Sequence, residues 1–159
     1  MNQLTREDAI KALTGCAITS IDVLDTEFDI VDQMLRMRFL PAQIPRFVRR
    51  CVVDRLYSWL NYIHSFIQPS QHSILHMHEY SMFSEEDRQH LQELARKIML
   101  LTRIAAKLDL SSSPDDEVKY IKTSLDSWLA IKKELLKYTT KNIAGWEKPL
   151  PKDDERSQY

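Results

Sequence analysis

The chain contains only two glycines among its 159 residues, Gly15 and Gly145. Glycine is the default residue wherever the backbone needs a positive φ, and it costs about 1 kcal/mol relative to alanine inside a helix. A β-rich fold or a glycine-loop enzyme of this length would need far more of it. The scarcity therefore predicts an all-α protein. It also excludes the phosphate-binding loop, the dinucleotide-binding fingerprint and the nucleophile elbow, since each depends on glycine.

Apolar residues recur at intervals of three and four along most of the chain, as on the buried face of a helix. Gly15 and the two prolines Pro41 and Pro45 divide this pattern in its first third. Ser84 and Ser113 are well placed as N-caps, and Pro114 suits the first position of a helix. We expect five helices, at about 5–14, 19–39, 45–67, 84–109 and 114–143.

Each predicted helix has one apolar and one polar face, so the four long helices must share a core. The short connections 40–45 and 109–114 make their flanking helices antiparallel neighbours. The sequence therefore predicts an up-down antiparallel four-helix bundle, preceded by a short extra N-terminal helix, in a single domain over 1–145. Residues 146–159 are charged and contain two prolines, which predicts a flexible, disordered C-terminal tail.

Whole-chain properties narrow the class of protein further. The formal net charge of −1 argues against a general coat for nucleic acid or a membrane-attracted surface. Two cysteines do not make a disulfide framework, and no signal peptide is evident, so we expect a cytoplasmic protein. No apolar run approaches the roughly 20 residues that a membrane span needs.

A block of acidic residues is followed by a block of arginines. The acids repeat at spacings of three, four and three, at Asp22, Asp25, Asp29 and Asp32. The simpler interpretation is that neighbouring helices pair these charges across their outer faces. The alternative is that arginine forks bind an acidic protein surface or an RNA backbone. The candidate residues for that binding are Arg46, Arg49 and Arg50.

The connection 67–83 is longer and more apolar than most loops between bundle helices. One interpretation is that it folds back and closes an open end of the bundle. The other is that it exposes a patch of methionine and aromatic side chains that another subunit covers. The candidate partner-binding residues are Met77, Tyr80, Met82 and Phe83.

All five histidines lie between residues 64 and 90. His72 and His76 could share a helical face, and His76 and His78 could share a face of an extended segment. Imidazoles at such spacings are typical zinc ligands, so His72, His76 and His78 form a candidate metal site. The spacing matches neither a zinc finger nor an HExxH motif, and otherwise we expect no cofactor.

No serine, cysteine or histidine is paired with a base in a recognisable catalytic setting. We therefore expect a non-enzymatic protein-interaction or assembly module that acts as a homodimer or as a subunit of a larger complex. One alternative is a helical nucleic-acid-binding or nuclease-type protein that uses the Arg-rich second long helix. Another is a metal-dependent enzyme that uses the histidine cluster.

Overall fold

A computed structural model describes residues 4–68, 73–111 and 113–149, and these residues form seven α-helices and no β-strand. The expected all-α class is therefore confirmed for the described part of the chain. The helices are α1 (Arg6–Gly15), α2 (Ile21–Phe28), α3 (Ile30–Met37), α4 (Ile44–Ile67), α5 (Ile74–Ser81), α6 (Glu85–Ser111) and α7 (Pro114–Trp146).

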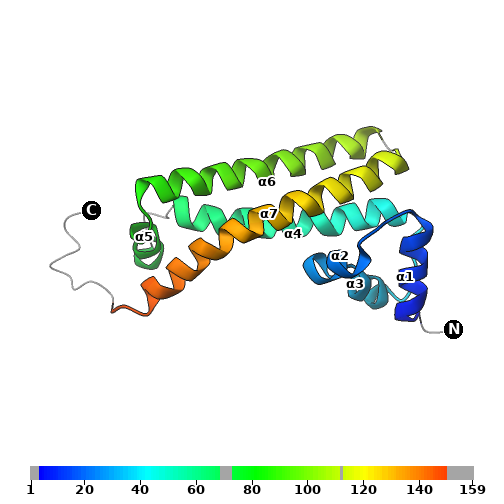
Figure 1. Cartoon of the computed structure of the whole chain (residues 1–159), viewed down its shortest axis with the longest axis horizontal. Coiled ribbons are helices and arrows are strands. Elements are labelled where there is room, and N and C mark those ends of the chain that lie inside the picture. Colours follow the sequence, from blue (N-terminus) through cyan, green and yellow to red (C-terminus); the bar gives the residue numbers. More distant parts are fainter. Residues whose placement is uncertain (1–3, 69–72, 112, 150–159) are drawn as a thin grey trace.

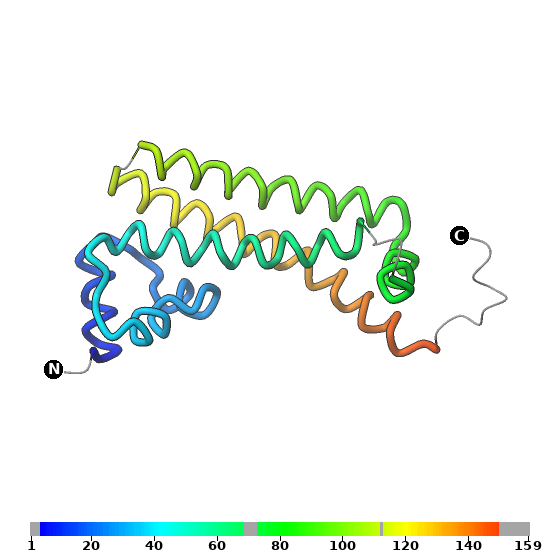
Figure 2. Tube along the Cα trace, turned by 180° about the vertical axis from the view of Figure 1, so that it is seen from behind, coloured from blue at the N-terminus to red at the C-terminus, as the bar shows by residue number. Residues whose placement is uncertain are grey.

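Three long helices, α4, α6 and α7, form the body of the molecule. Helix α4 packs against both of the others, and α6 runs antiparallel to α4 and α7 (Figure 1). Fully buried apolar side chains from all three helices meet in the centre, among them Leu56, Ile98 and Trp128. Helices α1 to α3 lie against one end of this body, and α5 lies at the other end (Figure 2).

The expected four-helix bundle is not confirmed, because its fourth long helix is missing. The segment predicted as one helix over 19–39 forms two eight-residue helices, α2 and α3. Asp29 separates them and has a left-handed backbone conformation, with φ of 57°. A further helix, α5, lies inside the connection 67–83, for which we expected no helix.

A hydrogen bond stabilises the break between α2 and α3. The backbone N–H of Val31, in the first turn of α3, donates to Oδ1 of Asp25 at 2.7 Å. A carboxylate at this position satisfies a donor that the helix leaves unpaired and complements the positive end of the helix dipole. Arg6 on α1 forms an ion pair with the same carboxylate. The break is therefore held by side chains rather than by glycine or proline.

Helix α1 ends in a Schellman motif without glycine at its left-handed position. The N–H of Ile18 donates to the carbonyl of Leu13 at 3.3 Å, and the N–H of Ala17 donates to the carbonyl of Thr14 at 3.0 Å. Ala17 has φ of 59°, a conformation usually given to glycine. Ile18 and Leu13 are both buried, as this motif favours. Gly15, two residues earlier, has no positive φ.

The two predicted N-caps, Ser84 and Ser113, are present, and Thr5 caps α1 as well. Thr5 and Asp8 form a capping box on α1, and Ser84 and Asp87 form one on α6. Ser113 accepts a hydrogen bond from the N–H of Asp116 at the start of α7. At its other end α7 continues to Trp146, three residues past its expected end, so the first residue of the predicted tail is helical. Residues 150–159 of that tail lie outside the described residues.

Glu27 joins the N-terminal helices to α7. Its side chain is 9% exposed and accepts hydrogen bonds from Nε1 of Trp128 at 2.8 Å and from Nζ of Lys132 at 2.7 Å. Burial raises the pKa of Glu27, but these hydrogen bonds and the positive charges of Lys132 and Arg55 outweigh it. The pKa therefore lies below its usual value of 4.5.

Replacing Ala17 with glycine will stabilise the protein. The left-handed conformation costs a residue with a Cβ about 1–2 kcal/mol, and glycine avoids most of that cost. We expect Ala17→Gly to raise the free energy of unfolding by up to about 1 kcal/mol, measured by urea denaturation. Ala106→Gly is the matched control, because Ala106 is exposed inside α6 and the same change there costs about 1 kcal/mol. If both variants change the free energy of unfolding in the same direction, the expectation is wrong.

Glu27→Gln will destabilise the protein in a pH-dependent way. Near neutral pH we expect a loss of about 1.5–3 kcal/mol, because charged hydrogen bonds become neutral ones. A carboxyl whose pKa is lowered by folding contributes its stability above its unfolded pKa and loses it as the carboxylate becomes protonated. The difference between wild type and variant should therefore shrink as the pH falls below 4.5.

Urea denaturation across this pH range measures the effect. The control is Glu86→Gln, which changes an exposed acid of α6 and should alter the free energy of unfolding by less than about 0.5 kcal/mol. If the free energies of unfolding of wild type and Glu27→Gln differ by the same amount at every pH, the ionised carboxylate does not make the proposed contribution.

Candidate functional site

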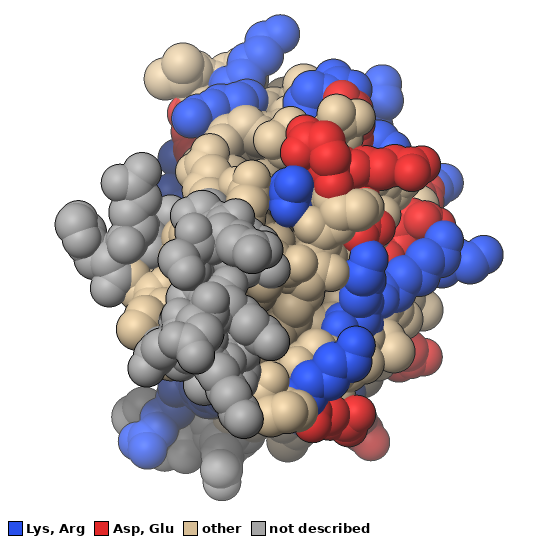
Figure 3. Space-filling view, turned by 90° about the vertical axis from the view of Figure 1, so that its left-hand side faces the viewer, with Lys and Arg blue, Asp and Glu red and all other residues tan. Residues whose placement is uncertain are grey.

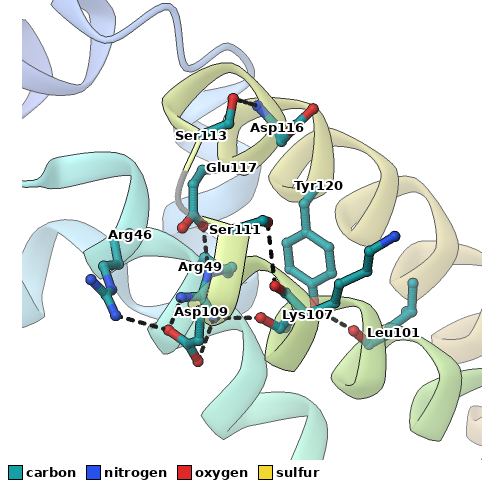
Figure 4. Close-up of polar contacts among 11 residues, drawn as sticks. Arg46, Arg49, Leu101, Lys107, Asp109, Ser111, Ser113, Asp116, Glu117 and Tyr120 are labelled. Carbon is teal, nitrogen blue, oxygen red and sulfur yellow. Dashed lines mark hydrogen bonds and ion pairs between the residues drawn. The ribbon is translucent and has the colours of Figure 1, made fainter.

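The Arg-rich part of α4 does not present all three predicted binding residues to solvent. Arg49 is 1% exposed, whereas Arg50 is exposed and Arg46 is partly buried. The Nε of Arg49 donates to Oε2 of Glu117 on α7 at 2.5 Å, and its Nη2 donates to Oδ1 of Asp109 on α6 at 2.5 Å (Figure 4). Arg49 is therefore removed from the predicted partner-binding set, because its guanidinium is occupied inside the protein.

The surrounding groups complete what we call the buried cluster, in which Arg49 and Glu117 are buried while Arg46 and Asp109 are partly exposed. Nη1 of Arg49 also donates to the carbonyl of Ala105 at 3.1 Å, and Arg46 donates to Asp109 at 3.2 Å. Burial lowers the pKa of Arg49, but its hydrogen bonds to Asp109 and Glu117 outweigh burial and hold the pKa above its usual value. The hydrogen bond from Arg49 is the main cause that lowers the pKa of Asp109. Arg49 and Asp109 are therefore both held in their charged forms.

Two cavities lie beside the N-terminal helices. One of about 460 Å³ lies between the end of α1 and the first turns of α4 and α7, where it is lined by Arg46 and Glu117 of the buried cluster. The other, of about 340 Å³, is lined by acidic residues and by Cys51. Burial raises the pKa of the Cys51 thiol to about 12, and the thiol donates a hydrogen bond to Gln33. Such a thiol is a poor nucleophile at neutral pH.

The predicted histidine site is not assembled in the described part of the chain. His76 is exposed on α5, while His78 is partly buried with its ring 5.1 Å from that of Trp146. His72 lies outside the described residues. Among the residues that the structure describes, no group of three or more His, Cys, Asp and Glu side chains could hold a metal ion.

The segment 73–83 folds back onto the end of the three long helices. Phe83 is 2% exposed, and its ring lies 5.0 Å from Phe66 of α4 and 6.2 Å from Tyr138 of α7. Arg88 of α6 lies over the ring of Tyr80 at 4.3 Å and donates hydrogen bonds to the carbonyls of Tyr80 and Phe83. Phe83 and Tyr80 therefore anchor the segment rather than form a free surface.

Helix α5 is also attached to the last turns of α7. Oε1 of Glu79 accepts hydrogen bonds from Nδ2 of Asn142 at 3.2 Å and from Nε1 of Trp146 at 3.0 Å. Met82 packs so closely against Gly145 that a Cβ there would overlap its side chain. Gly145 therefore leaves room for the flexible Met82 side chain to pack closely against α7, and it does not end the helix, which continues to Trp146.

One face of α5 remains exposed. No residue of α5 is buried, and its large apolar side chains are Ile74 at 61%, Leu75 at 53% and Met77 at 36% exposure. Figure 3 looks onto this end of the molecule and shows a strip of uncharged residues in the middle of the face, with charged residues along one side. We call Ile74, Leu75 and Met77 the α5 face. Of the four partner-binding residues predicted in this segment, only Met77 belongs to it.

Ile74 and Leu75 were missed by the sequence-based selection of site residues. That selection favoured methionine and aromatic side chains, and it treated the segment as a loop. The signal that could have identified them is Ser73, which accepts a hydrogen bond from the N–H of His76 and is the N-cap of α5. A cap at Ser73 places Ile74 and Leu75 in the first turn, where neither can reach the residues that anchor Phe83.

Comparisons with protein families, with curated protein sequences and with solved structures gave no match to this chain. No helix in the described part of the chain is long and apolar enough to cross a bilayer.

Removing the Arg49 side chain will strongly destabilise the protein. Arg49→Ala leaves Glu117 buried without its partner, and such a change costs about 3–5 kcal/mol. Arg50→Ala removes the same group from the neighbouring exposed position and should cost less than about 0.5 kcal/mol. Chemical denaturation of the two variants measures the difference.

A second substitution tests the cause. Adding Glu117→Gln to Arg49→Ala removes the uncompensated charge, so we expect the double variant to regain part of the lost stability. Equal stability of the Arg49→Ala and Arg50→Ala proteins would contradict a structural role for the buried cluster.

Proposed function

We propose that this protein is a non-enzymatic protein-interaction or assembly module, acting as a homodimer or as a subunit of a larger complex, and that the α5 face binds its protein partner. The observation that supports this most strongly is the exposure of Ile74 and Leu75 on an anchored helix. Contiguous apolar side chains on the surface of a soluble protein favour a covering partner, because their exposure to water is unfavourable.

The anchoring of α5 supports a binding role as well. Because Phe83 and Glu79 hold the segment to α4 and α7, the exposed side chains are presented in a fixed arrangement. A preorganised surface loses less conformational entropy when it binds than a free loop does. A short helix with apolar residues on one side can fit a groove of another protein.

The other two candidate functions receive less support from the described residues. The nucleic-acid-binding hypothesis has one fewer candidate residue, because the Arg49 side chain is buried in the protein interior. The metal-enzyme hypothesis rests on His72, His76 and His78, of which His72 lies outside the described residues. We also propose a cytoplasmic location, which the two free thiols of Cys16 and Cys51 support.

Partner capture by α5-face variants tests the proposal. The double variant Ile74→Ser/Leu75→Ser removes the two most exposed side chains of the face, and quantitative mass spectrometry measures the proteins that co-purify from the native cells. We expect the proteins held by wild type to be strongly depleted in this variant, because burying the exposed parts of the two side chains, 61% and 53%, contributes about 2–3 kcal/mol.

Leu110→Ser is the matched control. Leu110 is 90% exposed and lies near the opposite end of α6, so this variant changes a large exposed leucine away from the α5 face. It should retain the wild-type partners. If wild type and both variants capture the same proteins in the same amounts, the α5 face is not the binding surface.

A further inference from the structure

Helix α7 exposes a second set of apolar side chains. Leu129, Leu136 and Ile143 are 38%, 57% and 56% exposed and follow one another at intervals of exactly seven residues. Trp146, at 38% exposure, lies one turn beyond Ile143. A seven-residue interval places side chains on one face of a helix, as in the seam of a coiled coil. We call these four residues the α7 stripe, which extends over about 26 Å of helix.

No other helix of the described chain buries Leu129, Leu136 or Ile143, whereas Trp146 contacts α5 through Glu79 and His78. The core face of α7 lies one residue earlier in each repeat, at Trp128, Leu135 and Asn142, which are 2%, 3% and 6% exposed. Glu27 of α2 contacts α7 beside the stripe, through its hydrogen bond with Lys132. Beyond this point the C-terminal half of α7 extends past α1 to α3 (Figure 1).

We propose that the α7 stripe binds the same stripe of a second copy of this chain, with the two α7 helices antiparallel and the two-fold axis at Leu136. The inference rests on the proposed function and identifies the surface of its homodimeric form. In this arrangement Leu136 packs against the partner's Leu136, and Leu129 packs against the partner's Ile143. Leu129, Leu136 and Ile143 therefore each meet an apolar residue, whereas Trp146 lies opposite the partner's Asp126.

The charges between the apolar residues favour the antiparallel arrangement. With the axis at Leu136, the exposed Lys133 lies opposite the partner's Thr139 and so faces a hydroxyl group. In a parallel pair Lys133 would face its own copy, and like charges directly opposite one another are destabilising. The ammonium group of Lys132 is already paired with Glu27 of α2. Antiparallel helices also bring together opposite ends of the helix dipoles.

The ends of the stripe carry opposite charges. Glu147, just after the end of α7, lies opposite the partner's Leu125 in this register, one turn from the partner's Lys122. Lys122 and Glu147 are both exposed. The two-fold axis creates this pair of opposite charges twice, which adds electrostatic complementarity to the apolar contact.

A charge-swap experiment at Leu136 tests the two-fold arrangement. Light scattering coupled to gel filtration should give a mass of two chains for wild type. Leu136→Glu and Leu136→Lys should each give one chain, because each places like charges opposite one another on the axis. A mixture of the two variants should again give two chains, because Glu and Lys then face each other, and native mass spectrometry should find one copy of each variant in the complex.

The control is Leu110→Glu, which places the same charge on an exposed leucine of α6 and should leave the dimer intact. Circular dichroism confirms that the variants are folded. A one-chain mass for wild type, a dimer that survives Leu136→Glu, or a mixture that fails to associate would each overturn the proposal. These outcomes are independent of the α5 test, because a monomer that still captures its partner through Ile74 and Leu75 contradicts only the dimer.

Discussion

The buried guanidinium of Arg49 is the one group on which the arrangement of the long helices depends. It extends from α4 and contacts α6 through Asp109 and Ala105 and α7 through Glu117. Such a charge is stable inside a protein only when its partners are in place, since an unpaired buried charge is very unfavourable. The cluster therefore fixes the relative position of three helices at the end where α6 leads into α7. A buried ion cluster of this kind need not add net stability compared with an apolar core. It does make other relative positions of the three helices unfavourable, because they would leave its charges unpaired.

The sequence predicts the long helices well because each has strong local signals. Ser84 and Ser113 cap their helices as expected, and the apolar spacing inside them is regular. The break at Asp29 has no such signal, because Phe28 and Val31 continue the three-and-four spacing across it. The helix boundary there is identified by the capping of α3 by Asp25, six residues before Val31, and not by the apolar spacing.

The candidate site was harder to predict because its geometry depends on contacts between distant residues. Glu79 meets Asn142 and Trp146 more than 60 positions away in the chain, and local patterns carry no information about that pairing. For Arg49 a signal was present, since it precedes Leu56 and Ile63 by seven and fourteen residues and so shares their apolar face. A charged residue in such a position is a candidate for a buried ion pair rather than for a binding surface.

The attachment of α5 to α7 also has a dynamic consequence. Because α5 buries none of its own residues, its stability comes from its anchors, and the last turns of α7 are in turn covered there by α5. The two segments therefore form one cooperative unit whose local opening requires less free energy than unfolding of the whole protein. Hydrogen exchange should be slowed in both segments together when either is bound. A ligand on the α5 face would thus order Ile143 and Trp146, which couples the two exposed apolar surfaces thermodynamically.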